Sequence, residues 1–209
     1  KLGIQVKFKN NVCKIYGKGV EGYKYKKNLT INAENSGTLG RLILGLLINT
    51  THPIKIIGDK SLSKRDFKRI TDPLTKFGAK FKLKNKKNLP LTIYGSKNLK
   101  PVKYYEKKGS AQCKSAVIFG GMRTEGITFI KAKKSRNHTE IMSKNLKLPI
   151  SIIEKKKFDE IKVNKLKKIK VFNYNIPSDI SSSAFFIVLT ALSKGSELII
   201  KNVNINHSR

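Results

Sequence analysis

The chain has 209 residues, a formal net charge of +32 from 45 basic and 13 acidic side chains, and 39% apolar residues with no tryptophan. This size suits one large domain or two small ones, and the apolar fraction excludes a disordered polycation. The longest apolar stretches, 42–48 and 184–192, are far shorter than the roughly 20 residues of a membrane helix, so we expect no membrane span.

A unit of about seventy residues occurs twice along the chain and then begins a third time. Each copy starts with small, hydroxyl or amide residues that lead into a nearly all-apolar helix, followed by a β-branched run, an amphipathic helix and two strand-like runs. In the first copy these elements are 36–48, 54–57, 66–77, 79–83 and 91–94. In the second copy they are 110–122, 127–132, 139–146, 150–153 and 160–163, and the third has only 181–192 and 197–203. Two opening runs, 4–8 and 12–16, match the last two strands of such a unit.

The two kinds of helix predict the architecture. A helix that is apolar nearly all round must be buried, whereas an amphipathic helix must lie outside. We therefore expect an α/β fold of repeated helix–strand–helix–strand–strand units, in which buried parallel helices are surrounded by sheets and outer helices, like an α/β barrel turned inside out. Parallel buried helices would bring their starts to one end of the domain.

The starts of the three apolar helices carry the polar residues that this end would present. Helix starts expose unpaired backbone N–H groups and the positive end of the helix dipole, so a convergence of such starts would bind anions. Ordinary N-capping is the commoner explanation for any single serine there. The residues are Asn35, Ser36, Gly37 and Thr38 in the first copy, Ser110, Ala111 and Gln112 in the second, and Asp179, Ser181 and Ser182 in the third.

Cations recur at similar places in the copies. Arg41 and Lys114 each lie one turn into an apolar helix, where a charge is expensive without an anionic partner. Arg65 and Arg136 each precede an amphipathic helix, although the chain otherwise uses mostly lysine. Repeated arginines of this kind indicate planar recognition of phosphate or carboxylate.

Cysteine and histidine give no sign of a metal site. Cys13 and Cys113 stand far apart without a CxxC motif, and the three histidines form no HxxxH pair. We interpret both cysteines as core thiols of a protein in a reducing compartment.

Five segments, in order along the chain, resemble a known family, the 5-enolpyruvylshikimate-3-phosphate synthases among the enolpyruvyl transferases. They are NSGTLGRLILGLL at 35–47, GDKSLSKRDFKRITDPLTKFGA at 58–79, SAQCKSA at 110–116, SRNHTE at 135–140, and IPSDISSSAFF with the tail NINHSR at 176–209. The resemblance implies transfer of an enolpyruvyl group from phosphoenolpyruvate to the 5-hydroxyl of shikimate 3-phosphate in the shikimate pathway of aromatic amino acid biosynthesis. It implies no metal and no organic cofactor, a cytoplasmic location, no binding of nucleic acid or membrane, and a monomer at full length.

The resemblance also assigns substrate-binding residues. Ser110, Ala111, Gln112, Ser135 and Arg136 would hold shikimate 3-phosphate, Gly37 and Arg65 would bind phosphoenolpyruvate, and Asn35, Thr38 and Arg41 would shape the floor of the site. Asp66 stands where the family usually has proline and adds a negative charge beside Arg65, and Lys64 is an alternative to Arg65.

The family's first segment and most of its second domain have no match in this sequence. We therefore expect a fragment, with 1–175 as a repeat-built substrate-binding domain, incomplete at its N-terminus, and 176–209 as a last helix and strand leading toward a second domain. The family's acid/base carboxylates lie in the unmatched part, so no catalytic residue is assignable and the chain alone should be inactive. We interpret Asp179 and Glu140 as structural helix-start residues.

Two other interpretations stay open. The charge of +32 is compatible with a lysine-rich nucleic-acid-binding module, because a basic surface releases counterions when it neutralises phosphates. However, only six of the basic residues are arginines, and the lysines are spread along the whole chain, as a compositional bias on solvated surfaces would place them. A non-catalytic relative used for interaction is the third possibility.

Overall fold

The computed structural model describes residues 1–20 and 23–208 and divides into two compact units, Lys1–Lys170 and Val171–Arg209, each of which is described by itself. Two copies of one folding unit make up most of the first. The earlier copy contains β3 (Leu29–Asn32), α1 (Gly37–Leu46), β4 (Ile54–Ile57), α2 (Lys60–Ser63), α3 (Lys68–Thr75), β5 (Lys80–Lys84) and β6 (Asn88–Tyr94). The later copy contains β7 (Lys103–Glu106), α4 (Ala111–Met122), β8 (Thr128–Lys133), α5 (His138–Asn145), β9 (Ile150–Glu154) and β10 (Phe158–Val163).

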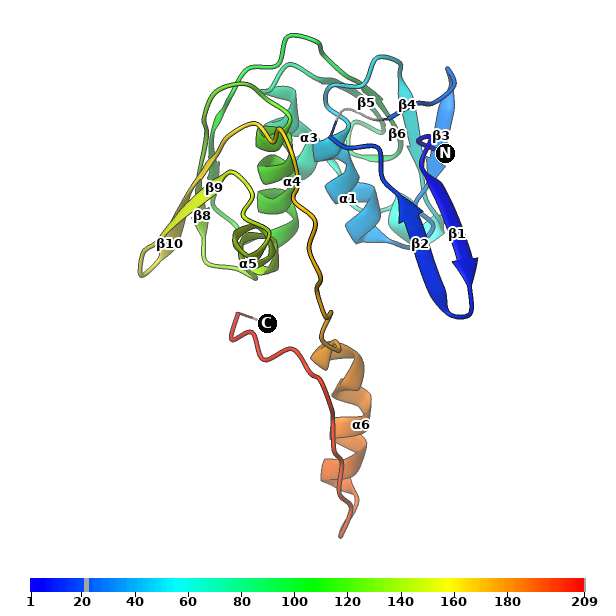
Figure 1. Ribbon diagram of the computed structural model, residues 1–209, viewed down its shortest axis with the longest axis vertical. Coiled ribbons are helices and arrows are strands. Elements are labelled where there is room, and N and C mark those ends of the chain that lie inside the picture. Colours follow the sequence, from blue (N-terminus) through cyan, green and yellow to red (C-terminus); the bar gives the residue numbers. More distant parts are fainter. Residues whose placement is uncertain (21–22, 209) are drawn as a thin grey trace. The chain divides into compact units, whose positions relative to one another are not determined.

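Each copy forms a four-stranded sheet with the same topology (Figure 1). The strand orders are β3-β4-β6-β5 and β7-β8-β10-β9. In both, the first two strands pair in parallel across a buried helix, and the remaining pairs are antiparallel. The predicted repeat is therefore correct in order but lacks its first element, because β3 and β7 were not recognised. Both have only four residues, and their parallel pairing to β4 and β8 depends on tertiary contacts that no local pattern reveals.

The outer helices are close to their predicted positions. The helix predicted over 66–77 is shorter, since α3 spans Lys68–Thr75 and the separate turn α2 precedes it. Asp66 lies between them, and its Oδ1 accepts a hydrogen bond from the Lys68 backbone nitrogen at 2.8 Å. Asn137 occupies the N-cap position of α5.

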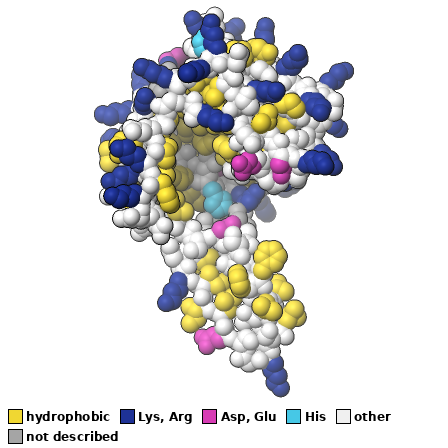
Figure 2. Space-filling view, turned by 90° about the vertical axis from the view of Figure 1, so that its right-hand side faces the viewer, with side chains coloured by type: hydrophobic (Ala, Val, Ile, Leu, Met, Phe, Trp, Pro, Cys, Tyr) yellow, Lys and Arg dark blue, Asp and Glu magenta, His cyan; other side chains and the backbone are white. Residues whose placement is uncertain are grey.

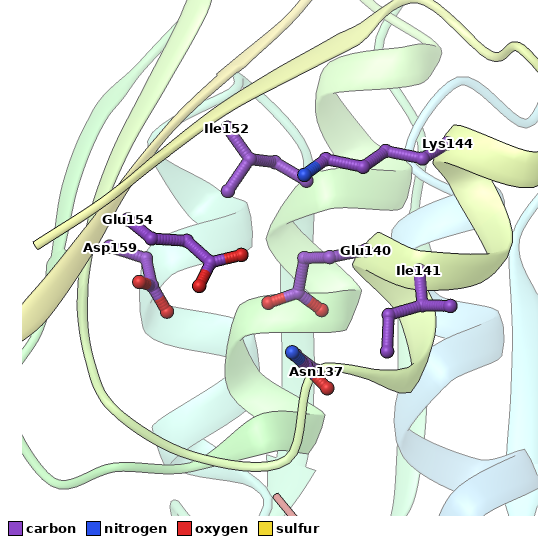
Figure 3. A pocket seen from close by; sticks show the side chains of 7 residues that line it. All are labelled: Asn137, Glu140, Ile141, Lys144, Ile152, Glu154 and Asp159. Carbon is purple, nitrogen blue, oxygen red and sulfur yellow. The ribbon is translucent and has the colours of Figure 1, made fainter. Parts of the chain in front are cut away.

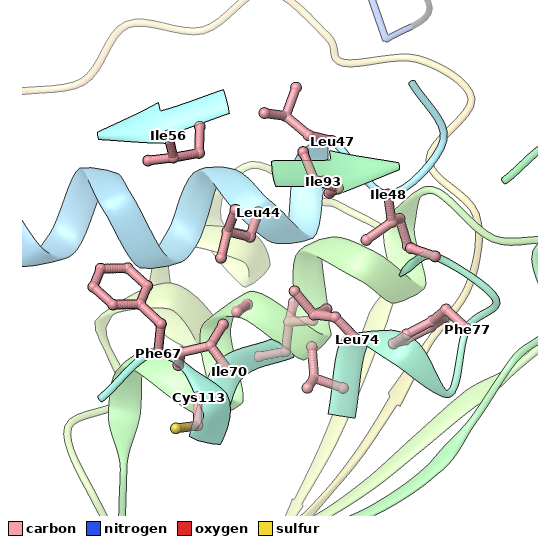
Figure 4. Close-up of a cluster of buried hydrophobic side chains, with 14 of the residues drawn as sticks. Leu44, Leu47, Ile48, Ile56, Phe67, Ile70, Leu74, Phe77, Ile93 and Cys113 are labelled. Carbon is pink, nitrogen blue, oxygen red and sulfur yellow. The ribbon is translucent and has the colours of Figure 1, made fainter. Parts of the chain in front are cut away.

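The apolar helices α1 and α4 pack directly against each other in the core. Gln112 at the start of α4 contacts Thr38 at the start of α1, and Ala116 lies beside Gly45 one to two turns further on, so the helices run parallel. A Cβ on Gly45 would lie 2.1 Å from the Ala116 carbonyl oxygen, which shows how closely the two backbones approach. Apolar side chains of α1, α3, β4 and β6 surround this contact (Figure 4).

The opening hairpin pairs β1 (Gln5–Lys9) with β2 (Val12–Tyr16) in antiparallel register. One face carries Val6 and Ile15 as a cross-strand pair, with Phe8 opposite Cys13. This face is exposed, with Phe8 at 72% accessibility. Cys113 is buried as expected, but the interpretation of Cys13 as a core thiol is wrong, because no element within the described residues covers its face of the hairpin.

The second unit contains α6 (Ile180–Leu192), and an isolated parallel bridge joins Ser178 to Val203. Asp179 is the N-cap, as expected, and its Oδ1 accepts from the Ser181 backbone nitrogen at 3.0 Å. The predicted strand 197–203 is reduced to that bridge, and the prediction that this helix is buried is wrong for the described structure, since none of its residues is buried. A unit of this size has too few elements to cover an apolar helix. Across the described ranges, no helix is both long and apolar enough to cross a membrane.

Candidate anion-binding site at the starts of α1 and α4

The N-caps of α1 and α4 are serines whose hydroxyls are used for capping. Ser36 Oγ accepts from the Leu39 backbone nitrogen at 3.1 Å, and Ser110 Oγ accepts from the Cys113 nitrogen at 3.3 Å. Capping thus explains both serine side chains. The remaining first-turn N–H groups of two parallel, adjacent helices point the same way, which concentrates positive potential at their common end.

Gln112 joins the two helix starts through its amide group. Arg41 Nη1 donates to Gln112 Oε1 at 2.6 Å, and Gln112 Nε2 donates to Thr38 Oγ1 at 3.1 Å. The amide is therefore held at both ends. One amide proton on Nε2 is left for another acceptor.

Two guanidinium groups flank Gly37, the first residue of α1. A Cβ placed on Gly37 would lie 3.0 Å from Arg65 Nη1 and 3.8 Å from Arg41 Nη1. A larger residue at this buried position would push against both arginines. Glycine thus keeps open the space between the helix start and the two cations.

The surroundings of Arg41 disfavour its positive charge. Its guanidinium stacks 5.6 Å from the centre of the Phe67 ring, and its Nε is buried without a hydrogen-bond partner among the described residues. Burial lowers the pKa of Arg41, and the nearby guanidiniums of Arg69 and Arg65 lower it further. Because three like charges repel one another here, an anion bound between them would be stabilised.

Asn35 supports this cluster from outside. Its Nδ2 donates to Asp59 Oδ2 at 2.5 Å, and Asp59 Oδ1 accepts from the Leu62 backbone nitrogen at 2.7 Å. These hydrogen bonds, chiefly the one from Leu62, lower the pKa of Asp59. Asn35 therefore ties the loop before α1 to α2, which leads directly to Arg65.

Ser135 and Arg136 lie in the loop between β8 and α5. Arg136 is exposed, whereas the Ser135 hydroxyl is buried and has no hydrogen-bond partner within the described chain. Among the described residues, no hydrogen bond joins Ser135 or Arg136 to Gln112 or Arg41. Their connection to the helix starts runs through α5, which begins two residues after Arg136.

Lys114, which corresponds to Arg41 in the second copy, has the anionic partner that its place in an apolar helix requires. Lys114 Nζ lies 2.5 Å from Glu140 Oε1, and the two side chains are only 0% and 5% exposed. Its anionic partner is thus supplied by α5 inside the protein. Glu140, interpreted as a helix-start residue, does lie in the first turn of α5 and has this second role as well.

Three residues that shape the site were missed from the sequence. Asp59 caps α2, and Arg69 contributes to the positive cluster. Buried Glu106 accepts from the backbone nitrogens of Lys108 and Ser110, at 3.1 and 2.9 Å, and so shapes the loop before α4. Arg69 lies in the first turn of α3, and its nearness to Arg65 in the sequence was the one signal for it.

The face shown in Figure 2 is basic, without one concentrated patch. Lysine and arginine side chains are spread over the face shown in Figure 2. Within the described residues, no group of three or more His, Cys, Asp or Glu side chains could hold a metal ion.

Comparisons with known proteins match the whole chain. The family model described as EPSP synthase (3-phosphoshikimate 1-carboxyvinyltransferase) matches residues 1–209. The 3-phosphoshikimate 1-carboxyvinyltransferases of Caldicellulosiruptor saccharolyticus and Streptococcus mutans are 40% and 38% identical over 213 and 210 residues, covering 100% of this chain and 48% of each relative. The chain therefore spans about half the length of the curated relatives it matches.

Solved structures give the same picture. EPSP synthase from Acinetobacter baumannii superposes with a TM-score of 0.82 at 32% identity, over 98% of this chain and 46% of that one. The enolpyruvyl transferase NikO from Streptomyces tendae matches at 13% identity with a TM-score of 0.51, over 78% of this chain and 38% of NikO. At that identity the likeness concerns the fold alone.

Proposed function

The chain belongs to the EPSP synthase family, and from this membership we propose that it supplies part of an enzyme that moves the enolpyruvyl group of phosphoenolpyruvate to the 5-hydroxyl of shikimate 3-phosphate. The observation that carries the proposal is the bridge from Arg41 through Gln112 to Thr38, with Gly37 open beneath Arg65. This arrangement joins two helix starts and two guanidinium groups at one place. It suits a reaction between two phosphorylated anions.

The chemistry requires two multiply charged substrates to approach despite their mutual repulsion. Helix starts and guanidinium groups offset that repulsion, and fixed donors cost no reorganisation during the reaction. In this proposal Gly37 and Arg65 receive phosphoenolpyruvate, while Asn35, Thr38 and Arg41 form the floor of the site. The free amide proton of Gln112 is available to an oxygen of shikimate 3-phosphate.

Shikimate 3-phosphate would also contact Ser110, Ala111, Ser135 and Arg136. The buried, unpaired hydroxyl of Ser135 and the exposed guanidinium of Arg136 support this assignment, because both can still donate to a phosphate. We assign no general acid or base within the chain and expect no enolpyruvyl transfer by the chain alone. Residues 1–175 would act as the substrate-binding domain, and 176–209 would lead toward a second domain of a cytoplasmic, monomeric enzyme.

Titration calorimetry with shikimate 3-phosphate at moderate salt tests the proposal. We expect saturable binding that Gln112→Ala and Arg136→Ala both weaken. Lys76→Ala serves as the matched control, since Lys76 is an exposed cation at the far end of α3. Binding that all three variants weaken equally, or that gives way to salt-sensitive binding of any polyanion, would favour a nucleic-acid-binding surface instead.

A further inference from the structure

A second connection between the two sides of the site lies in the core, where α4 meets the start of α5. Lys114 and Glu140 form an ion pair at 2.5 Å with side chains 0% and 5% exposed. The adjacent residues repeat the contact, since the Ser115 and Thr139 hydroxyls are 2.7 Å apart. Two consecutive residues of α4 therefore hold two consecutive residues of α5.

These four residues stand next to the loops that the proposed function uses. Lys114 follows Gln112 by two residues, and Glu140 follows Arg136 by four. Within the described structure, no hydrogen bond joins the 135–136 loop directly to the start of α4. The two loops follow the paired strands β7 and β8, and beyond the ends of these strands the position of the 135–136 loop depends on how α5 is held against α4.

The ion pair is not explained by stability. Removing two charges from water costs several kcal/mol per ion, and well-packed apolar side chains of similar volume often serve a core equally well or better. An ion pair, unlike an apolar contact, fixes one alignment of the two helices. A pair fully inside the core and next to two substrate loops is consistent with a need for alignment.

Two acidic side chains near Glu140 already have a cation of their own. Glu140 lines a hollow of about 20 Å³ together with Lys144, Glu154 and Asp159 (Figure 3). Lys134 lies 2.6 Å from Asp159 and 3.9 Å from Glu154. Among the ion pairs of the described residues, the partner of Glu140 is Lys114.

We propose that Lys114 and Glu140 are positioning residues, which set the Ser135–Arg136 loop against the start of α4 so that both sides of the shikimate 3-phosphate site face one ligand. The proposal rests on the proposed function. Neither residue touches the substrate. Their effect on binding runs through the orientation of α5.

The test replaces both charges at once, with Lys114→Met and Glu140→Met in one chain. Because the pair is replaced by apolar side chains, we expect an unchanged unfolding midpoint. The dissociation constant for shikimate 3-phosphate should rise about tenfold or more, because the donors of Ser135 and Arg136 would no longer face the phosphate together with Gln112. The control removes an exposed ion pair, with Lys165→Gln and Glu125→Gln, and should leave affinity unchanged.

Amide hydrogen exchange makes the test independent of substrate binding. In the double variant, residues 134–138 should exchange faster while strand β8 keeps its protection. If exchange and affinity both stay at their original values in a folded double variant, the positioning role is refuted. If the unaltered chain fails to bind shikimate 3-phosphate, the proposed function fails for the chain alone, and the exchange result still decides the positioning role.

A second variant covers the case in which the double methionine chain does not fold. Ser115→Ala with Thr139→Val removes both hydroxyls of the neighbouring contact and leaves no buried polar group unpaired. It should loosen the same loop by a smaller factor. Unchanged exchange at 134–138 in this variant would contradict the proposal.

Discussion

The helices α1 and α4 begin alike, yet the cation of α1 lies at the helix starts and the cation of α4 lies in the core. Both have a serine N-cap and an apolar body, with a cation about one turn in. Arg41 comes five residues after its cap and Lys114 four, and one residue turns the side chain by about 100° around the helix. Arg41 therefore reaches Gln112 at the helix starts, whereas Lys114 enters the core and meets Glu140. The helical phase of a cation, not its presence, decides whether it belongs to the site or to the core.

Removal of the buried cation Lys114 should have the largest effect on stability. Lys114→Met alone leaves Glu140 buried without its cation and should cost about 3–5 kcal/mol of unfolding free energy. Urea denaturation followed by circular dichroism measures the loss. A loss within about 0.5 kcal/mol, typical of a surface substitution, would mean that Lys114 is not buried as described.

Pushing the two helices apart should have the next largest effect. Gly45→Ala places a Cβ 2.1 Å from the Ala116 carbonyl oxygen, and we expect a net loss of about 2 kcal/mol because backbone must move. Gly17→Ala is the matched control, since no atom of the described residues lies within 4 Å of a Cβ there. Equal unfolding midpoints for the two variants would show that α1 and α4 are further apart than described.

Removing the cation on the site side should affect binding more than stability. Arg41→Met frees the Gln112 amide and removes one charge from the cluster, so affinity for shikimate 3-phosphate should fall about tenfold or more. Unfolding free energy should change by only about 1 kcal/mol, because the side chain is only partly buried. Calorimetry and denaturation on Arg41→Met and the control Lys76→Met separate the two effects.

The smallest effect concerns the acid limb of stability. The pKa of Asp59 is lowered in the folded chain, so its contribution is complete above its unfolded pKa of about 3.9 and is lost as the pH falls through the folded value. Asp59→Asn keeps an N-cap for α2 but does not titrate. Denaturation between about pH 5 and pH 2 should therefore show a shallower decline for the variant, and parallel curves would contradict this role.

Much of this organisation was predictable from the sequence. The internal repeat gave the order of helices and hairpins, and the family inferred from five motifs is confirmed by the family model over the whole chain. The predicted α/β architecture is confirmed by the fold of EPSP synthase. Arg41 and Gln112 were both named as site residues, and the structure places them in direct contact.

The rest depended on information that local patterns do not contain. β3 and β7 are too short to be recognised from a local sequence pattern, and their parallel partners come more than twenty residues later. The burial of Lys114 depends on its position around the helix, which differs from that of Arg41 by one residue, and on a glutamate in another helix. The exposure of Cys13 depends on what covers the hairpin, which an alternating pattern of residues does not state.

The anion-binding site at the starts of α1 and α4 can be tested with two-dimensional ¹⁵N–¹H spectra of the labelled chain, recorded during addition of shikimate 3-phosphate. We expect shifts confined to the amides of 36–41, 110–113 and 135–136, with little change at Glu140, the partner of Lys114. Shifts spread over the lysine-rich strands β5 and β8, with the two helix starts unaffected, would show that the charge alone attracts anions and that no such site exists.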